Sequence, residues 1–145
     1  MSKTNTLETQ WLLLLLNNTP ITLIGDAAGI LGSAAAGSLY LSGHTADPGE
    51  AGDQTTSEIA YTSYARVAVA RTTSGFTVSG NAGSLVANTN FPAGTGGTGT
   101  MTHVGIGTSA SGAGKLLLKG AITPNIVCGN GITPTVQAGT VVTED

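Results

Sequence analysis

Hydrophobic residues follow two different patterns along the chain, one in an N-terminal block and one in the region after it. The block is the apolar run of residues 11–16, which predicts a helix over about residues 6–16. Asn5 and Glu8 have the spacing of a helix start, and residues 17–20, which end in proline, stop the helix. Because the run is apolar on every side of that helix, we expect it to be buried in the domain core or against another subunit.

From residue 38 onward the pattern changes to short β-branched runs separated by turns rich in Gly and Ser. The predicted strands cover residues 38–42, 64–71, 76–80, 85–87, 101–107, 115–122, 126–128 and 135–143. Residues 109–114 are expected to connect a hairpin, and Asn130-Gly131 suits a tight turn. Residues 25–37 fit either a short helix or a packed loop. These features predict a mainly β fold, an antiparallel β-sandwich or jelly roll with one short N-terminal helix.

The length of the chain indicates one domain. We expect it to span residues 1–145, with the helix and its stop in residues 1–20 and the β-sandwich in residues 38–145. A positive mean hydropathy of +0.22 with a net charge of only −3 argues against a disordered chain. The apolar run of residues 11–16 is far shorter than the roughly 18 residues that a membrane span needs, so no membrane span is expected.

Charged residues are scarce. They make up 9 % of the chain, whereas about 25 % is usual for a soluble domain, and residues 72–114 contain no Asp, Glu, Lys or Arg. Such a surface favours a subunit that is covered by other protein, and closed symmetry would bury one apolar patch repeatedly. We therefore expect a homo-oligomer, a homotrimer in the first instance. The expected subunit interface consists of Trp11, Leu12, Leu13, Leu14, Leu15 and Leu16.

The fragments that resemble binding motifs have simpler explanations. Residues 94–99 have the spacing G-x-G-x-x-G, but a strand rather than a helix is predicted after them, so we expect a loop. Residues 112–115 lack the first Gly and the hydroxyl residue of a phosphate-binding loop. The five basic residues form no cluster, and no nucleic-acid partner is expected.

Candidate catalytic and metal-binding residues are few and scattered. The one acidic concentration, in residues 47–58 beside His44, could offer oxygen ligands to Ca²⁺ but lacks the alternating ligand spacing, so a solvated loop is expected. His44 and His103 are far apart in sequence and no nucleophile motif accompanies them. Cys128, the one cysteine, is expected to be a small buried hydrophobic residue. We therefore expect no cofactor, no metal, no catalytic residue and no enzymatic activity.

Several longer stretches of the chain carry a resemblance to known proteins: residues 39–52, 58–69 and 102–107, together with the Leu-rich start, residues 91–93 and residues 138–144. They resemble a family of virion proteins of tailed bacteriophages that are commonly described as tail-fibre proteins. The resemblance thus extends over most of the chain. It departs from the expected pattern at Gly43, where a larger residue is expected between the strand and His44.

The residue pattern and the resemblance agree on a structural virion protein at the particle surface. Because the chain has no repeat and no heptad seam, we favour a capsid decoration (cement) protein that bridges and stabilises capsid subunits. The phage capsid protein and further copies of this chain would then be its partners. The alternative is a tail-fibre or baseplate subunit that contacts other tail proteins and takes part in host attachment. A carbohydrate-binding module remains a third alternative, although the chain has few aromatic residues for a sugar platform.

Overall fold

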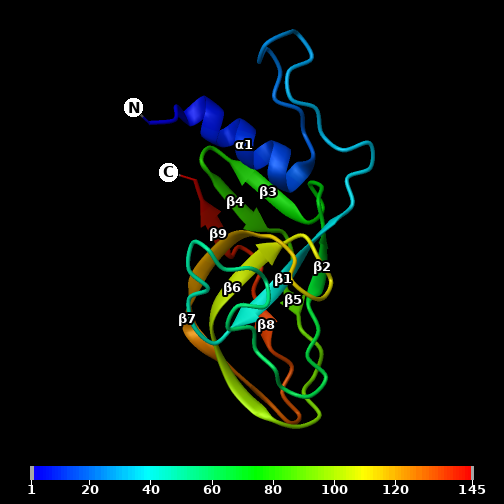
Figure 1. Cartoon of the computed structure of the whole chain (residues 1–145), viewed down its shortest axis with the longest axis vertical. Coiled ribbons are helices and arrows are strands. Elements are labelled where there is room, and N and C mark those ends of the chain that lie inside the picture. Colours follow the sequence, from blue (N-terminus) through cyan, green and yellow to red (C-terminus); the bar gives the residue numbers. More distant parts are fainter. Residues whose placement is uncertain (1, 145) are drawn as a thin grey trace. The chain divides into compact units, whose positions relative to one another are not determined.

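The computed structural model describes residues 2–144 of the chain, which form one helix and nine β-strands (Figure 1). Strands take up 40 % of the chain and helix 9 %. The elements, in order, are α1 (Asn5–Asn17), β1 (Ser38–His44), β2 (Val67–Ala70), β3 (Phe76–Ser79), β4 (Ala82–Leu85), β5 (Thr89–Asn90), β6 (Thr98–Gly107), β7 (Leu116–Gly129), β8 (Thr135–Val136) and β9 (Val141–Thr143). The predicted fold class, mainly β and antiparallel with one short N-terminal helix, is confirmed.

The contacts divide the chain into two compact units, each assembled from segments that are distant in sequence. The helical unit consists of residues 1–38, 70–87 and 137–145, and the β unit consists of residues 39–69 and 88–136. The prediction of one domain stays a prediction.

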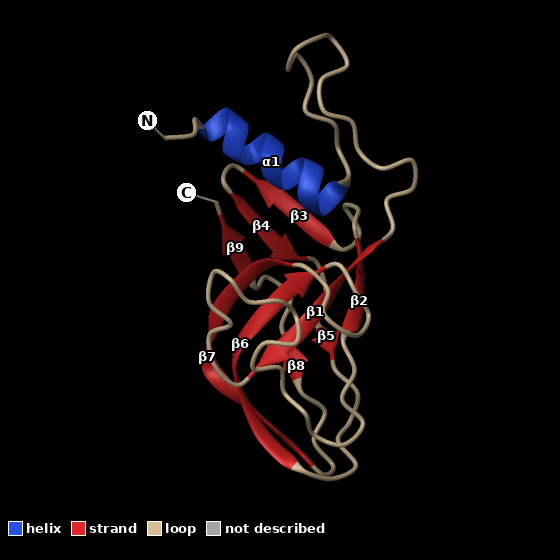
Figure 2. Ribbon diagram, viewed as in Figure 1, coloured by secondary structure: helices blue, strands red, loops and turns tan. Residues whose placement is uncertain are grey.

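In the β unit, a four-stranded sheet has the order β2-β1-β6-β7, and β5 pairs with β8 in a separate ladder (Figure 2). The pairs β1–β6 and β6–β7 are antiparallel, and the hairpin predicted at residues 109–114 joins β6 to β7. A bulge sets residues 122–125 of β7 opposite Thr102 alone. The core contains the buried side chains of Leu39, Leu41, Ile59, Tyr61, Phe91, Met101, Cys128 and Val136. The arrangement is sandwich-like.

In the helical unit, α1 packs on the three-stranded sheet β3-β4-β9 (Figure 2). Leu12 and Leu16, four residues apart and therefore on one helix face, have no exposed surface, and Phe76 of β3 is buried with them. Gly83 of β4 leaves room for this packing, since a Cβ atom at that position would lie 2.4 Å from Cδ1 of Leu16.

The helix begins one residue earlier and ends one residue later than expected. Its N-cap is Thr4, whose hydroxyl accepts a hydrogen bond from the N–H of Leu7. The predicted start at Asn5 and Glu8 was therefore wrong by one position, because Thr4 is also a good N-cap residue and lies in extended backbone. Residues 25–37, for which a short helix and a packed loop were both possible, form a loop.

Several strand boundaries were also wrong. The strand expected at residues 85–87 lies at Ala82–Leu85, since Gly83, which weakens a strand prediction, is there to make room for Leu16. The strands expected at 115–122 and 126–128 form one strand, β7, because an edge strand with a bulge tolerates Pro124. The strand expected at 135–143 is two strands, β8 and β9, because a turn at Gly139, with φ of 79°, separates them.

Candidate interaction surface

The segment between α1 and β1, residues 18–37, is a long loop whose base is fixed to the end of the helix. Asn18 ends the helix in the left-handed conformation, with φ of 57°. Its side-chain Nδ2 donates to the carbonyl of Ser33 at 2.8 Å, and its Oδ1 accepts from the N–H of Ser33 at 2.7 Å. Further out, Ile21 and Ile30 form an antiparallel bridge with N···O distances of 3.0 and 2.8 Å. The base of the loop is therefore a narrow, hydrogen-bonded neck.

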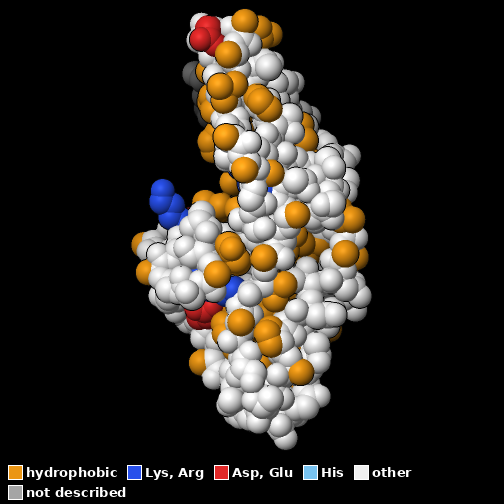
Figure 3. All heavy atoms as spheres, turned by 90° about the vertical axis from the view of Figure 1, so that its right-hand side faces the viewer, with side chains coloured by type: hydrophobic (Ala, Val, Ile, Leu, Met, Phe, Trp, Pro, Cys, Tyr) orange, Lys and Arg blue, Asp and Glu red, His pale blue; other side chains and the backbone are white. Residues whose placement is uncertain are grey.

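Beyond the neck, the tip of the loop exposes hydrophobic side chains. Every residue from 22 to 28 is exposed, with Leu23 at 82 % and Ile24 at 44 %. Leu23 has φ of 64°, an uncommon conformation for a bulky residue. Asp26 uses Oδ1 to accept hydrogen bonds from the N–H groups of Ala28 and Gly29, at 2.9 and 2.8 Å. Figure 3 shows hydrophobic side chains along this loop, with an acidic group at its far end.

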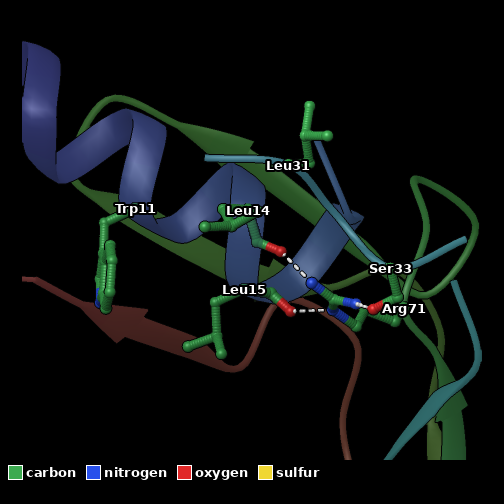
Figure 4. A pocket seen from close by; sticks show the side chains of 6 residues that line it. All are labelled: Trp11, Leu14, Leu15, Leu31, Ser33 and Arg71. Carbon is green, nitrogen blue, oxygen red and sulfur yellow. Dashed lines mark hydrogen bonds between the residues drawn. The ribbon is translucent and has the colours of Figure 1, made fainter. Parts of the chain in front are cut away.

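Beside the base of the loop lies an apolar groove of about 230 Å³ (Figure 4). It is lined by Trp11, Leu14, Leu15, Leu31, Ser33 and Arg71. Trp11 is 45 % exposed and Leu31 is 67 % exposed. The groove is thus an open apolar surface with a single basic group.

Arg71 holds one side of the groove together. Its Nε donates to the carbonyl of Leu15 at 2.7 Å, one terminal nitrogen donates to the carbonyl of Leu14, and the other donates to the hydroxyl of Ser33 at 2.7 Å (Figure 4). These carbonyls lie in the last turn of α1, where the helix leaves acceptors unpaired and favours positive charge. A guanidinium has five N–H donors, and these contacts use three of them.

The predicted interface run divides into two groups of residues. Leu12 and Leu16 are buried by the sheet of their own unit, whereas Trp11 is exposed and Leu14 and Leu15 line the groove. Leu13 is half-buried, and its carbonyl oxygen accepts a hydrogen bond from the N–H of Thr19 at the helix end. The assignment of the run to a subunit interface stays a prediction.

The residues that sequence reasoning missed are Leu23, Ile24, Leu31 and Arg71. A signal was present: apolar residues occur among the glycines and alanines of residues 21–37 without the period of a helix or a strand. Large apolar side chains in such a turn-rich segment cannot all reach a core. The contacts of Arg71 could not be predicted from the local sequence, because its hydrogen-bond acceptors are helix-end carbonyls that lie 56 and 57 residues earlier in the chain.

In the β unit, Ser42 and His44 form a pair that resembles a nucleophile and its base. Nδ1 of His44 lies 2.8 Å from the carbonyl oxygen of Thr56, to which it donates, and Nε2 then accepts from the hydroxyl of Ser42 at 2.9 Å. Burial lowers the pKa of His44. Both side chains have no exposed surface, so a substrate cannot reach them in this conformation. His103 faces His44 across the β1–β6 register but its imidazole hydrogen-bonds Thr102 instead.

Glu58 and Arg66 form a two-point ion pair next to this histidine. Nε of Arg66 donates to Oε1 of Glu58 at 2.6 Å, and a terminal nitrogen donates to Oε2 at 2.8 Å. The hydroxyl of Tyr64 donates to Oε1 at 2.8 Å and accepts from the N–H of Gly43 at 3.0 Å. Burial and the neighbouring carboxylate raise the pKa of Tyr64. The network fixes the connection between β1 and β2 to Gly43 of β1.

The acidic side chains of residues 47–58 bind different partners and do not gather into one cluster. Asp47 and Glu50 pair with Lys119 at 2.9 and 3.0 Å, and Asp53 accepts from the N–H and the hydroxyl of Thr55 at 2.7 and 2.6 Å. A hydrogen bond from the N–H of Gly49, and then Lys119, lowers the pKa of Asp47. Within residues 2–144, no group of three or more His, Cys, Asp or Glu side chains is placed to hold a metal ion.

The remaining motif residues have packing roles. In the loop of residues 94–99, a Cβ atom on Gly94 would lie 2.1 Å from the carbonyl oxygen of Gly129, so glycine permits a close backbone approach. Gly114 is likewise packed against the side chain of Gln54. Cys128 is buried, as expected, and burial raises the pKa of its thiol. Over the described residues, no helix is long and apolar enough to cross a membrane.

Together these features define a mainly β protein in which polar side chains pair with one another in one unit and large hydrophobic side chains are exposed in the other. The family described as Podophage GP4 fiber I protein gp80 matches residues 2–144. The chain belongs to this family of phage fibre-type structural proteins, and it is a virion-associated protein. A search of the curated proteins found no match.

Proposed function

We propose that the chain is a structural subunit of a podophage fibre and is held in the virion by the helical unit. The observation that carries this proposal is the distribution of exposed hydrophobic residues. Of the nine large hydrophobic side chains that are exposed in residues 2–144, seven belong to the helical unit: Trp11, Leu23, Ile24, Ile30, Leu31, Val86 and Val141. Exposed apolar surface of this kind marks contact with other protein.

The family match favours the fibre over the capsid decoration that the sequence pattern suggested, because the matched family is named for a fibre protein. The compact β unit is compatible with either position in the particle. Capsid decoration is therefore kept as an outcome of the experiment below.

We also propose that the protein is not an enzyme. Two observations support this proposal. Ser42 and His44 are buried. The side chains of Lys119, Thr55 and Arg66 each bind different acidic residues, so these carboxylates do not form one site. Substitution of Ser42 by Ala would test a catalytic role: particles carrying Ser42→Ala should keep full infectivity, whereas a nucleophile in an essential reaction would lose it.

The position in the virion can be tested with particles that carry an epitope tag on this chain and with particles that lack the chain. A fibre subunit predicts label on the fibres, loss of adsorption to cells, and a shell that resists heat and osmotic shock as well as wild type does. A decoration protein predicts label over the capsid and a shell that is less resistant, because a bound subunit stabilises the shell. Label on the capsid with normal adsorption would contradict the proposal.

A further inference from the structure

We propose that the loop tip of one copy, residues 22–28, inserts into the apolar groove beside α1 of a second copy of the same chain. The groove is lined by Trp11, Leu14, Leu15, Leu31, Ser33 and Arg71, and the tip presents Leu23, Ile24 and Asp26. This inference goes beyond the proposed function, because it concerns a contact between copies and holds for a fibre or for any other position in the virion.

The groove has the size of a site for side chains. Its volume of about 230 Å³ lies below the roughly 300–1,000 Å³ typical of small-molecule pockets. It exceeds the cavity of about 150 Å³ that holds one benzene molecule. A groove of this volume therefore accommodates one or two aliphatic side chains, and the tip offers two adjacent ones, Leu23 and Ile24.

The charges of the tip and the groove are complementary. In the groove, Arg71 uses three of its five N–H donors on Leu14, Leu15 and Ser33, which leaves two for a partner. At the tip, Asp26 uses Oδ1 for the turn, and Oδ2 makes no hydrogen bond or ion pair within residues 2–144. Asp26 is the one acidic residue between Glu8 and Asp47. An apolar pair with one carboxylate thus matches an apolar groove with one guanidinium.

The tip cannot enter the groove of its own chain. The Asn18–Ser33 hydrogen bonds and the Ile21–Ile30 bridge hold the neck closed, and the loop runs away from α1 beyond them (Figure 1). The occupant must therefore come from another molecule, and a second copy presents the required chemistry.

The backbone of Leu23 gives a separate reason to assign a role to the tip. A bulky side chain at φ of 64° is strained, and neither burial nor contact within its own chain offsets that strain, since the residue is 82 % exposed. Contact with a neighbouring copy would bury this side chain.

Such a contact joins two different surfaces, the tip of one copy and the groove of another. Every copy then offers one tip and one groove, and the contacts pair two copies reciprocally, close into a larger ring or continue along an axis. A tip-to-tip contact would instead join two identical surfaces, and cross-linking distinguishes it from the tip-to-groove contact.

The experiment uses two variants of the full chain that each introduce one cysteine, Leu23→Cys and Leu31→Cys, expressed separately and together. The native Cys128 is 1 % exposed and does not compete for oxidant. Under mild oxidation, the co-expressed pair should form covalent dimers on a non-reducing gel, and each variant alone should stay monomeric. Cross-linking of Leu23→Cys with itself would overturn the tip-to-groove contact in favour of a tip-to-tip one. Absence of cross-links in the co-expressed pair would overturn the proposal altogether.

Association of the purified chain, measured by sedimentation, gives a second test. Leu23→Asn introduces a residue that tolerates the left-handed backbone and removes the apolar side chain. This substitution should raise the dissociation constant about tenfold or more. Asp26→Asn keeps the Oδ1 acceptor of the turn and should abolish the dependence of association on salt. The matched control is Val127→Ala, which removes exposed apolar surface (61 %) from the β unit and should leave association unchanged. A wild-type chain that stays monomeric, or equal loss in the control, would refute the contact.

Discussion

The helical unit and the β unit both contain few charged residues, but they differ in which side chains they pair and which they expose. In the β unit, polar groups pair with one another: Glu58 with Arg66 and Tyr64, His44 with Ser42 and Thr56. In the helical unit, Arg71 pairs with the end of α1, and the loop and the groove leave hydrophobic side chains exposed. Charged residues are about equally scarce in the two units, so the difference lies in the hydrophobic side chains: of the nine large ones that are exposed in residues 2–144, seven belong to the helical unit.

The largest expected effect separates buried from exposed leucines within the helical unit. Leu16→Asp places a charge where there is no exposed surface and should cost about 4 kcal/mol or more, enough to unfold the unit. Leu31→Asp, at a position that is 67 % exposed, is the matched control and should leave the fold intact. Trp11, the one tryptophan of the chain, lies in this unit, so its fluorescence during urea unfolding reports the effect directly. Equal destabilisation by both substitutions would contradict the assignment of the two faces.

In the β unit, the buried network should carry the next largest effect. Arg66→Met removes a cation whose side chain is 2 % exposed and leaves Glu58 without its ion-pair partner, which should cost about 3 kcal/mol. Lys119→Met removes a cation that pairs with Asp47 and Glu50 at the surface, and should leave the unfolding midpoint unchanged. Urea unfolding followed by circular dichroism compares the two variants. If Lys119→Met were the more damaging, pairing within the β unit would not be what stabilises it.

Gly43 offers a smaller effect that tests packing in the same unit. A Cβ atom at this position would lie 1.9 Å from Sδ of Met101 and 3.3 Å from Cγ2 of Ile59, which explains why the larger residue expected from the family resemblance is absent. Gly43→Ala should therefore cost about 2 kcal/mol through overpacking. Gly120→Ala is the control, because a Cβ atom there meets nothing within 4 Å. Thermal unfolding of both variants would show the difference, and equal midpoints would mean that Met101 moves aside freely.

Features that depend on local sequence patterns could be predicted from the sequence, and features that depend on tertiary contacts could not. The fold class, the helix and the β6–β7 hairpin depend on local patterns, a six-residue apolar run and a Gly- and Ser-rich turn, and were predicted. The position of β4 depends on Leu16 packing over Gly83, a tertiary contact that a local pattern does not contain. Of the residues that line the groove, the sequence pattern singled out Trp11, Leu14 and Leu15, and their role in an interface stays a prediction. Leu23 and Leu31 were missed because the segment that contains them has no period, and Arg71 because its partners are carbonyl groups of a distant helix end.

The smallest expected effect is a dependence of the β unit on pH through His44. Burial lowers the pKa of His44, and the nearby positive charges of Arg66 and His103 act in the same direction. The hydrogen bond to Thr56 and the nearby Glu58 favour the protonated form and offset part of this decrease. In the unfolded chain the pKa is the ordinary 6.5. As the pH falls below about 6.5, the unfolded chain binds a proton before the folded chain does, so stability decreases until the lowered pKa of the folded state is reached.

Urea unfolding at several pH values between about 7 and 5 measures this effect, in a range above the pKa values of Asp47 and Asp53, which hydrogen bonds lower further. His44→Gln keeps a side chain with a donor and an acceptor and should remove the decrease between pH 7 and pH 5. The tryptophan fluorescence of Trp11 gives an internal comparison, because the transition of the helical unit, which contains no histidine, should change less over the same range. A decrease that persists unchanged in His44→Gln would assign the pH dependence to groups other than His44, and the buried imidazole would then contribute to packing alone.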